Sequence, residues 1–154
     1  MSDNSRDKDY NENLAKLFRA ENWEERAEAA RNLGYIRDGR AVNLLVKALK
    51  NEKDETVKDR IIEAMGRIGH PKATMSIVEI LKQELDKDLA DKSRLFYIIE
   101  SLMKIGDKRA LEHLGILLTS CDADIKSLAE EAFECIDPNW QENLKKERLE
   151  KKVS

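Results

Sequence analysis

Residues 33–41 read LGYIRDGRA, and the same pattern returns as MGRIGHPKA at 65–73 and as LMKIGDKRA at 102–110. Its beginning appears a fourth time as FECIDP at 133–138. Each copy is anchored by an isoleucine, and the four are Ile36, Ile68, Ile105 and Ile136. The anchors are 32, 37 and 31 residues apart, a period typical of a chain built from repeated structural units.

The apolar residues around each anchor predict two helices per repeat. Apolar side chains stand three and seven places before the first anchor, as Leu33 and Ala29, and these places share one helical face. Polar residues that can begin the first helix of a repeat stand at Asn22, Glu55 and Asp124. A second amphipathic pattern follows each turn, over about 41–49, 73–81 and 110–118.

The turn between the two helices carries glycine. Gly69 and Gly106 directly follow their anchors and permit the left-handed backbone that ends many helices, whereas the first copy has Arg37 there and a glycine at Gly39. A single helix pair cannot bury its apolar face, so the pairs must stack. We therefore expect an all-α protein, an α-solenoid of stacked antiparallel helix pairs with about nine helices.

This pattern resembles HEAT repeats, in particular the short type found in phycobilisome bilin lyases and in many small archaeal and bacterial proteins. The three turn copies carry the resemblance, together with Val57-Lys58 and Ile125-Lys126, and it covers about residues 14–137. Two repeats depart from the pattern, with Glu25 and Arg94 where Val57 and Ile125 stand. The resemblance implies the solenoid fold but no single activity, because such repeats serve many purposes.

The pattern also predicts the organisation of the chain. We expect a disordered tail at 1–10, a solenoid over 11–137 and a capping helix with a tail at 138–154. The repeats fall at about 23–50, 55–87, 91–120 and 123–137. At the N-terminal end, a short helix with one apolar face closes the stack through Leu14, Leu17 and Phe18. At the other end, Trp140 and Leu144 cover the last repeat.

The second repeat is five residues longer than its neighbours. Leu81, Leu85 and Leu89 follow at four-residue steps, which predicts that its second helix simply continues. The bulky residues at 95–97 then either fill the space under this longer helix or form a ridge that contacts a partner.

The composition of the chain excludes several classes of protein. With 154 residues, 38% charged residues, 6 Gly and 2 Pro, the chain is neither a β-sandwich nor a disulfide scaffold. Its net charge of −3 argues against nucleic acid as a partner. No signal peptide or membrane span stands out, and Cys121 and Cys135 match no zinc-ligand spacing. We expect a cytoplasmic monomer that holds no cofactor or metal.

Nothing in the sequence predicts an enzyme. The two histidines, His70 and His113, are not followed by glutamate, whereas deoxyhypusine hydroxylase, built of similar repeats, uses His-Glu pairs as iron ligands. The phosphate-binding, dinucleotide and hydrolase motifs are absent. Aspartates at 38 and 107 recur beside basic residues, which predicts an ion-pair ladder from one turn to the next.

The second helices usually line the concave side of such a stack, so their outward positions are the candidate partner-binding residues. They are Arg40, Asn43, Lys47, Lys50, Lys72, Met75, Glu79, Lys82, Arg109, Glu112 and Ile116. Six are basic and two are acidic; Met75 and Ile116 are either exposed contact residues or tucked against neighbouring helices. We expect a non-enzymatic interaction module or scaffold that binds a protein or peptide. The alternatives are an accessory subunit resembling bilin lyase components and a weak nucleic-acid binder.

Overall fold

The computed structural model describes residues 2–153, and within that range the chain is helical without a strand. The nine α-helices are α1 (Ser2–Arg19), α2 (Trp23–Ile36), α3 (Val42–Asn51), α4 (Glu55–Ile68), α5 (Thr74–Leu85), α6 (Lys92–Ile105), α7 (Leu111–Leu114), α8 (Ala123–Ile136) and α9 (Trp140–Val153). Four 3₁₀ segments accompany them: η1 (Gly39–Ala41), η2 (Pro71–Ala73), η3 (Lys108–Ala110) and η4 (Gly115–Thr119). The predicted all-α solenoid is confirmed.

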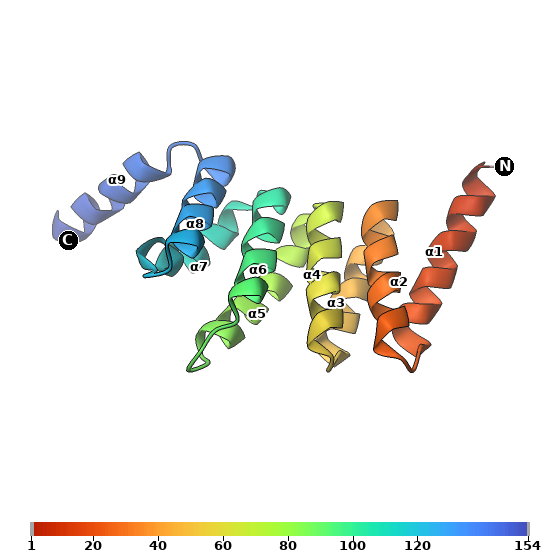
Figure 1. The fold of residues 1–154 in the computed structure, drawn as a ribbon. Helices are drawn as coiled ribbons and strands as arrows, with labels where there is room; N and C mark the ends of the chain where they lie inside the picture. Colours follow the sequence, from red (N-terminus) through yellow and green to blue (C-terminus); the bar gives the residue numbers. More distant parts are fainter. Residues whose placement is uncertain (1, 154) are drawn as a thin grey trace.

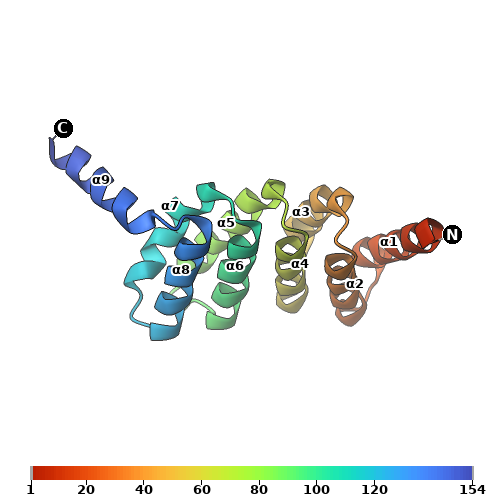
Figure 2. The same ribbon diagram turned by 90° about the horizontal axis from the view of Figure 1, so that it is seen from above.

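The helices form two layers. The first helices of the repeats, α2, α4, α6 and α8, stand side by side, and the second helices α3, α5 and α7 lie behind them (Figure 1). The view from above separates the same two layers (Figure 2). First helices pack directly on one another along the stack, whereas α3 and α5 contact the next repeat through its first helix and its 3₁₀ turn.

Each first helix begins with the same side-chain cap. Asn22 accepts a hydrogen bond from the Glu25 N–H at 2.8 Å, and Asp54 accepts one from the Val57 N–H at 3.1 Å. Asp91 and Asp122 cap α6 and α8 in the same way. The predicted start at Asn22 is right, while the capping residues of α4 and α8 are Asp54 and Asp122 rather than Glu55 and Asp124.

The first helices α2, α4 and α6 each end in a left-handed residue. Gly69 and Gly106 have φ values of 76° and 74°, as the sequence predicts. In the first repeat the same place is taken by Arg37, with φ 57°, and Gly39 has no part in this cap. A residue with a side chain is strained in this conformation by about 1 kcal/mol relative to glycine.

The turn that follows is closed by one side chain in each repeat. Asp38, His70 and Asp107 each accept a hydrogen bond from the backbone N–H two residues on, at 2.9–3.1 Å. The predicted ladder between turns is wrong, because Arg40 and Arg109 fold back onto the aspartate of their own turn at 2.7 Å. One link does cross between turns, from Arg109 Nη2 to the Pro71 carbonyl at 3.2 Å.

The Asp107 carboxylate makes the free energy of unfolding depend on pH in the acid range. Hydrogen bonds from the Arg109 side chain are the largest cause that lowers the pKa of Asp107, to about 2 from its usual 3.8. The stability that the carboxylate contributes is therefore present above pH 3.8 and is lost as the pH falls through about 2. We expect Asp107→Asn, which keeps the capping oxygen, to cost about 1 kcal/mol at neutral pH, after allowance for the exposed Arg109.

Urea denaturation of the wild type and Asp107→Asn across the acid range checks this expectation. The difference in unfolding free energy should shrink between pH 4 and pH 2. A difference that stays constant down to pH 2 would show that the charge of Asp107 contributes nothing.

Two glycines bring the first helices close together. A Cβ on Gly66 of α4 would lie 2.8 Å from the Ser101 Cα of α6, and one on Gly34 of α2 would lie 2.9 Å from the Ala64 Cα. Ser101 is buried and donates a hydrogen bond to the Ile62 carbonyl at 3.0 Å. The layer of first helices is therefore held at backbone contact in the middle of the stack.

The predicted disordered tail at 1–10 is wrong for residues 2–10, which form the first half of α1. Tyr10 and Leu17 are buried against α2, and the Arg40 guanidinium lies 4.7 Å from the Tyr10 ring. Asp7 pairs with the same arginine at 3.1 Å. Phe18, expected in the apolar face, is 43% exposed. Contacts with Arg40, in the turn of the first repeat, thus hold the polar residues 2–10 in a helix.

The predicted extension of α5 is also wrong, since the helix ends at Leu85 and Leu89 is exposed in a loop. Glu52 and Glu84 close the ends of equivalent second helices, and each accepts the backbone N–H of the residue that caps the next helix, Asp54 at 3.1 Å and Asp91 at 2.6 Å. The glutamate and the residue that donates to it are two positions apart in the first repeat and seven positions apart in the second. The five extra residues are therefore looped out between fixed points.

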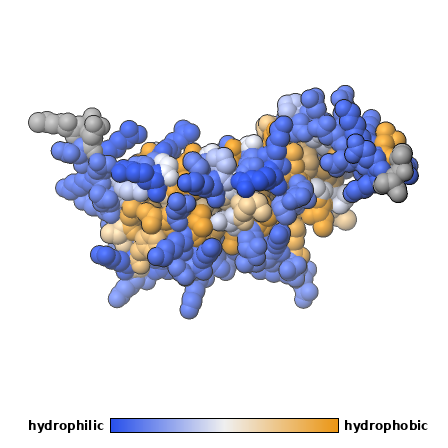
Figure 3. Space-filling model, turned by 180° about the vertical axis from the view of Figure 1, so that it is seen from behind, coloured by the Kyte–Doolittle hydropathy of each residue, from blue (hydrophilic) through white to orange (hydrophobic). Residues whose placement is uncertain are grey.

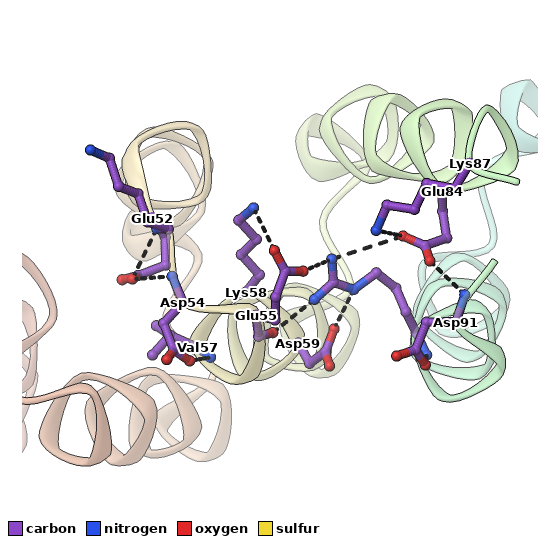
Figure 4. A network of polar contacts seen from close by, with 11 residues as sticks. Glu52, Asp54, Glu55, Val57, Lys58, Asp59, Glu84, Lys87 and Asp91 are labelled. Carbon is purple, nitrogen blue, oxygen red and sulfur yellow. Dashed lines mark hydrogen bonds and ion pairs between the residues drawn. The ribbon is translucent and has the colours of Figure 1, made fainter. Parts of the chain in front are cut away.

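A buried ion network joins the second and third repeats (Figure 4). Arg94 of α6 is 6% exposed; it pairs through Nε with Asp59 at 2.8 Å and through Nη1 with Glu55. Its Nη2 donates to the Glu55 carbonyl at 2.9 Å. Glu84, 1% exposed, lies 4.0 Å from Nη1 and is also paired with Lys87 at 2.8 Å. The apolar residue that stands here in the second and fourth repeats, Val57 and Ile125, is thus replaced by an arginine whose charge is paired.

The C-terminal helix covers the last repeat only in part. Trp140 packs against Phe133, with ring centroids 5.2 Å apart, and donates a hydrogen bond from Nε1 to Glu134 at 2.6 Å. Leu144 is half-buried, and α9 points away from the stack (Figures 1 and 2). The expectation that Trp140 and Leu144 together cover this end therefore holds for Trp140 alone.

Candidate functional site

The structure places all eleven candidate residues on one side of the stack, and all are exposed. They come from the second helices α3, α5 and α7 with their 3₁₀ turns and from η4. We call the surface they form the second-helix face. Helical periodicity alone predicts these exposed positions, because each stands a fixed number of residues from a buried residue of the same helix.

Two of these residues are large and apolar. Met75 is 42% exposed and Ile116 is 64% exposed, so neither side chain is tucked against the neighbouring helices. Ile116 lies in η4, where the second helix of the third repeat tightens from α to 3₁₀ geometry. Figure 3 views this side of the molecule and shows hydrophobic surface between hydrophilic side chains along the stack.

The charges on this face divide into two kinds. Arg40 and Arg109 are held by aspartates of their own turns, and the hydrogen bonds that Arg40 donates to Asp38 are the largest cause that raises the pKa of Arg40. The side chains of Lys47, Lys50, Lys72 and Lys82 form no ion pair with the described residues. The positive charges of the second-helix face that are free to pair with a partner are thus those of these four lysines.

A groove of about 200 Å³ runs between α3 and α5. Its apolar lining is formed by Val46, Leu49 and Ile80, and Lys50 and Glu79 belong to its charged lining. The sequence assigned Leu49 and Ile80 to the core and did not find the groove. The groove is open because α3 and α5 make few direct contacts with each other.

A larger hollow of about 770 Å³ lies between α9 and the second helix of the third repeat. Leu111, Leu118, Phe133 and Trp140 contribute apolar side chains to it, and Glu112 of the second-helix face lies at its edge. The hollow exists because α9 leaves the last repeat partly open.

The histidines have structural roles. His70 Nδ1 accepts the Lys72 N–H at 3.1 Å, and His113 lies half-buried with Nε2 3.1 Å from Glu112. Across residues 2–153 no three His, Cys, Asp or Glu side chains gather in a way that could hold a metal ion. In the same range, no helix combines the length and the apolar character of a membrane span.

Comparison with known proteins agrees with this architecture. No curated protein matches the chain. A family model for HEAT repeats matches residues 11–95, which is more than half of the sequence and includes the turns at 33–41 and 65–73. The structure repeats the helix pair and capped turn once more at 92–119, most of which lies beyond the matched region. The chain therefore belongs to the HEAT-repeat family.

Proposed function

We propose that this chain is a non-enzymatic interaction module that binds a protein or peptide segment along its second-helix face. The observation that carries the proposal is the exposure of Met75 and Ile116 on the same face as the α3–α5 groove. HEAT repeats commonly mediate contacts between proteins. The proposal includes a cytoplasmic, monomeric protein.

The chemistry of the face describes the partner. An apolar side chain that enters the groove would contact Val46 and Ile80, and Met75 adds a flexible thioether that adapts to different shapes. The unpaired lysines around these residues favour carboxylates. The best ligand is thus a segment with apolar anchors flanked by Asp or Glu, since a recognition patch commonly has an apolar centre and a charged rim.

The alternatives named from the sequence gain no support from the site. A role like that of bilin lyase components rests on the turn motif alone. Nucleic-acid binding would need an unbroken basic surface, and here acidic Glu79 and Glu112 interrupt the lysines.

The test is a double substitution, Met75→Asp with Ile116→Asp. Peptides selected from a displayed random library on the wild-type protein should lose at least about tenfold in affinity for this variant, because two apolar contacts are replaced by charges that repel acidic flanks. Isothermal titration calorimetry with the selected peptides measures the loss. A thermal melt should show little change, since both side chains are on the surface.

The matched control is Leu89→Asp with Leu149→Asp. These leucines are 88% and 62% exposed but lie in the α5–α6 loop and on α9. Peptide affinity should stay within about twofold of the wild type. Equal losses of peptide affinity in the two double variants would show that the peptides do not bind the second-helix face. Binding to duplex DNA that is tighter than peptide binding and weakens steeply with salt would identify nucleic acid as the partner instead.

A further inference from the structure

A third pocket lies away from the second-helix face, across the C-terminal ends of α2, α4 and α6. Its volume is about 410 Å³, and its lining residues are Gly34, Tyr35, Arg37, Gly66, Arg67, Gly69 and Lys104. All of them come from first helices or their caps. The three glycines contribute backbone to its lining.

The lining carries positive charge without an acid. Arg37, Arg67 and Lys104 are its ionised side chains, and those of Arg37 and Lys104 make no hydrogen bond or ion pair within residues 2–153. Arg67 Nη2 pairs with Glu63 at 3.2 Å, but Arg67 Nη1 is buried without a hydrogen-bond partner. A buried donor left unsatisfied costs about 1–3 kcal/mol, more for a charged group.

One wall of the pocket is an aromatic ring fixed by cations. Tyr35 is 56% exposed, and its ring lies 4.2 Å from the Arg67 guanidinium and 5.7 Å from that of Arg31. Hydrogen bonding with Arg31 and then Arg67 lowers the pKa of the Tyr35 hydroxyl. These contacts place two guanidinium groups beside the Tyr35 ring that lines the pocket.

The backbone of Arg37 supplies an independent observation. The equivalent caps in the next two repeats are Gly69 and Gly106, whereas Arg37 adopts the same left-handed conformation with a side chain. Basic residues near helix C-termini stabilise the helix dipole, which could account for Lys104. That effect explains neither a strained arginine where glycine is better nor the unpartnered Nη1 of Arg67. Strain of this kind concentrates at binding sites.

We propose that this pocket binds a phosphate group, supplied either by a phosphorylated side chain of a partner or by a small phosphorylated molecule. A phosphate ester carries a charge of about −1.5 to −2 and three acceptor oxygens, which matches two or three cations and an unsatisfied guanidinium donor. This site is separate from the second-helix face and does not depend on its function.

The test is an NMR titration of the ¹⁵N-labelled full chain at constant ionic strength. Inorganic phosphate and a phosphotyrosine peptide should each shift the amides of Gly34, Gly66 and Gly69 saturably, with a Kd of about 1 mM or lower. Tighter binding of the peptide identifies a phosphorylated protein segment as the source, and equal binding identifies a free phosphate or small ester. The unphosphorylated peptide should cause no saturable shift.

The decisive variant is Arg37→Gly with Lys104→Gln. Arg37→Gly relieves the left-handed strain, so the melting temperature should not fall, while phosphate affinity should drop at least about fivefold. Lys47→Gln with Lys50→Gln removes the same net charge from the second-helix face and should leave the affinity within about twofold. Unsaturable shifts, an unchanged affinity for the decisive variant, or equal losses in both would overturn the proposal.

Discussion

Replacing Arg94 with alanine is expected to lower the free energy of unfolding by about 3–5 kcal/mol, because it leaves buried carboxylates without their cation. Asp59 and Glu84 both face the Arg94 guanidinium, and burial already raises the pKa of Asp59 in spite of that arginine. Urea denaturation followed by far-UV circular dichroism measures the loss. Arg109→Ala, which removes the exposed ion pair with Asp107, is the matched control and should cost at most about 1 kcal/mol.

A compensated variant separates the charge effect from loss of packing. Arg94→Ile with Asp59→Ala gives this interface the residue types found elsewhere in the chain, with Ile125 and Ala27 at the equivalent places. Buried ion pairs can often be exchanged for apolar side chains at little cost, so this variant should regain at least about half of the lost stability. A single Arg94→Ala variant that loses less than about 1 kcal/mol would contradict the argument.

Gly66→Ala is expected to destabilise the fold by about 1–3 kcal/mol, because the new Cβ would force α4 and α6 apart. The atoms it would meet include the Ser101 Cα, which belongs to the backbone and cannot rotate away. In an open helix the same substitution would be stabilising by about 1 kcal/mol, so the sign of the effect reports the close contact. Thermal and urea denaturation provide the measurement.

The matched control for this variant is Gly115→Ala. Gly115 has φ −55°, and a Cβ there would have nothing within 4 Å. Alanine should therefore raise the free energy of unfolding by about 0.5–1 kcal/mol. If Gly66→Ala were as stable as Gly115→Ala, the first helices would not be held at backbone contact.

The parts of the fold that depend on offsets within one repeat could be predicted from the sequence. The exposed positions of the second helices, Met75 and Ile116 among them, follow from helical periodicity, and Gly69 and Gly106 mark where first helices end. Contacts between distant segments could not be predicted in this way. Asp7 is ordered by Arg40, which is 33 residues further along the chain, so a polar segment becomes helical where composition favoured disorder.

The candidate sites show the same division. The second-helix face was found because it repeats, whereas the basic pocket combines Arg67 and Lys104, which directly precede their anchor isoleucines, with Arg37, which directly follows its own. The loop at 86–90 was missed because four-residue spacing of leucines favours a helix. The helix instead ends at Leu85, and the buried Glu84 accepts a hydrogen bond from the Asp91 N–H on the far side of the loop.

A chain of similar units faces the problem of stacking them in the right order, and Arg94 helps to solve it. On α4 its guanidinium meets Asp59 and Glu55, but the equivalent places on α2 hold Ala27 and Trp23. If α6 were to pack against α2, a buried cation would lose both carboxylates, at a cost of several kcal/mol. The interchangeable apolar faces therefore drive the repeats together, and one cation specifies which neighbour the third repeat accepts.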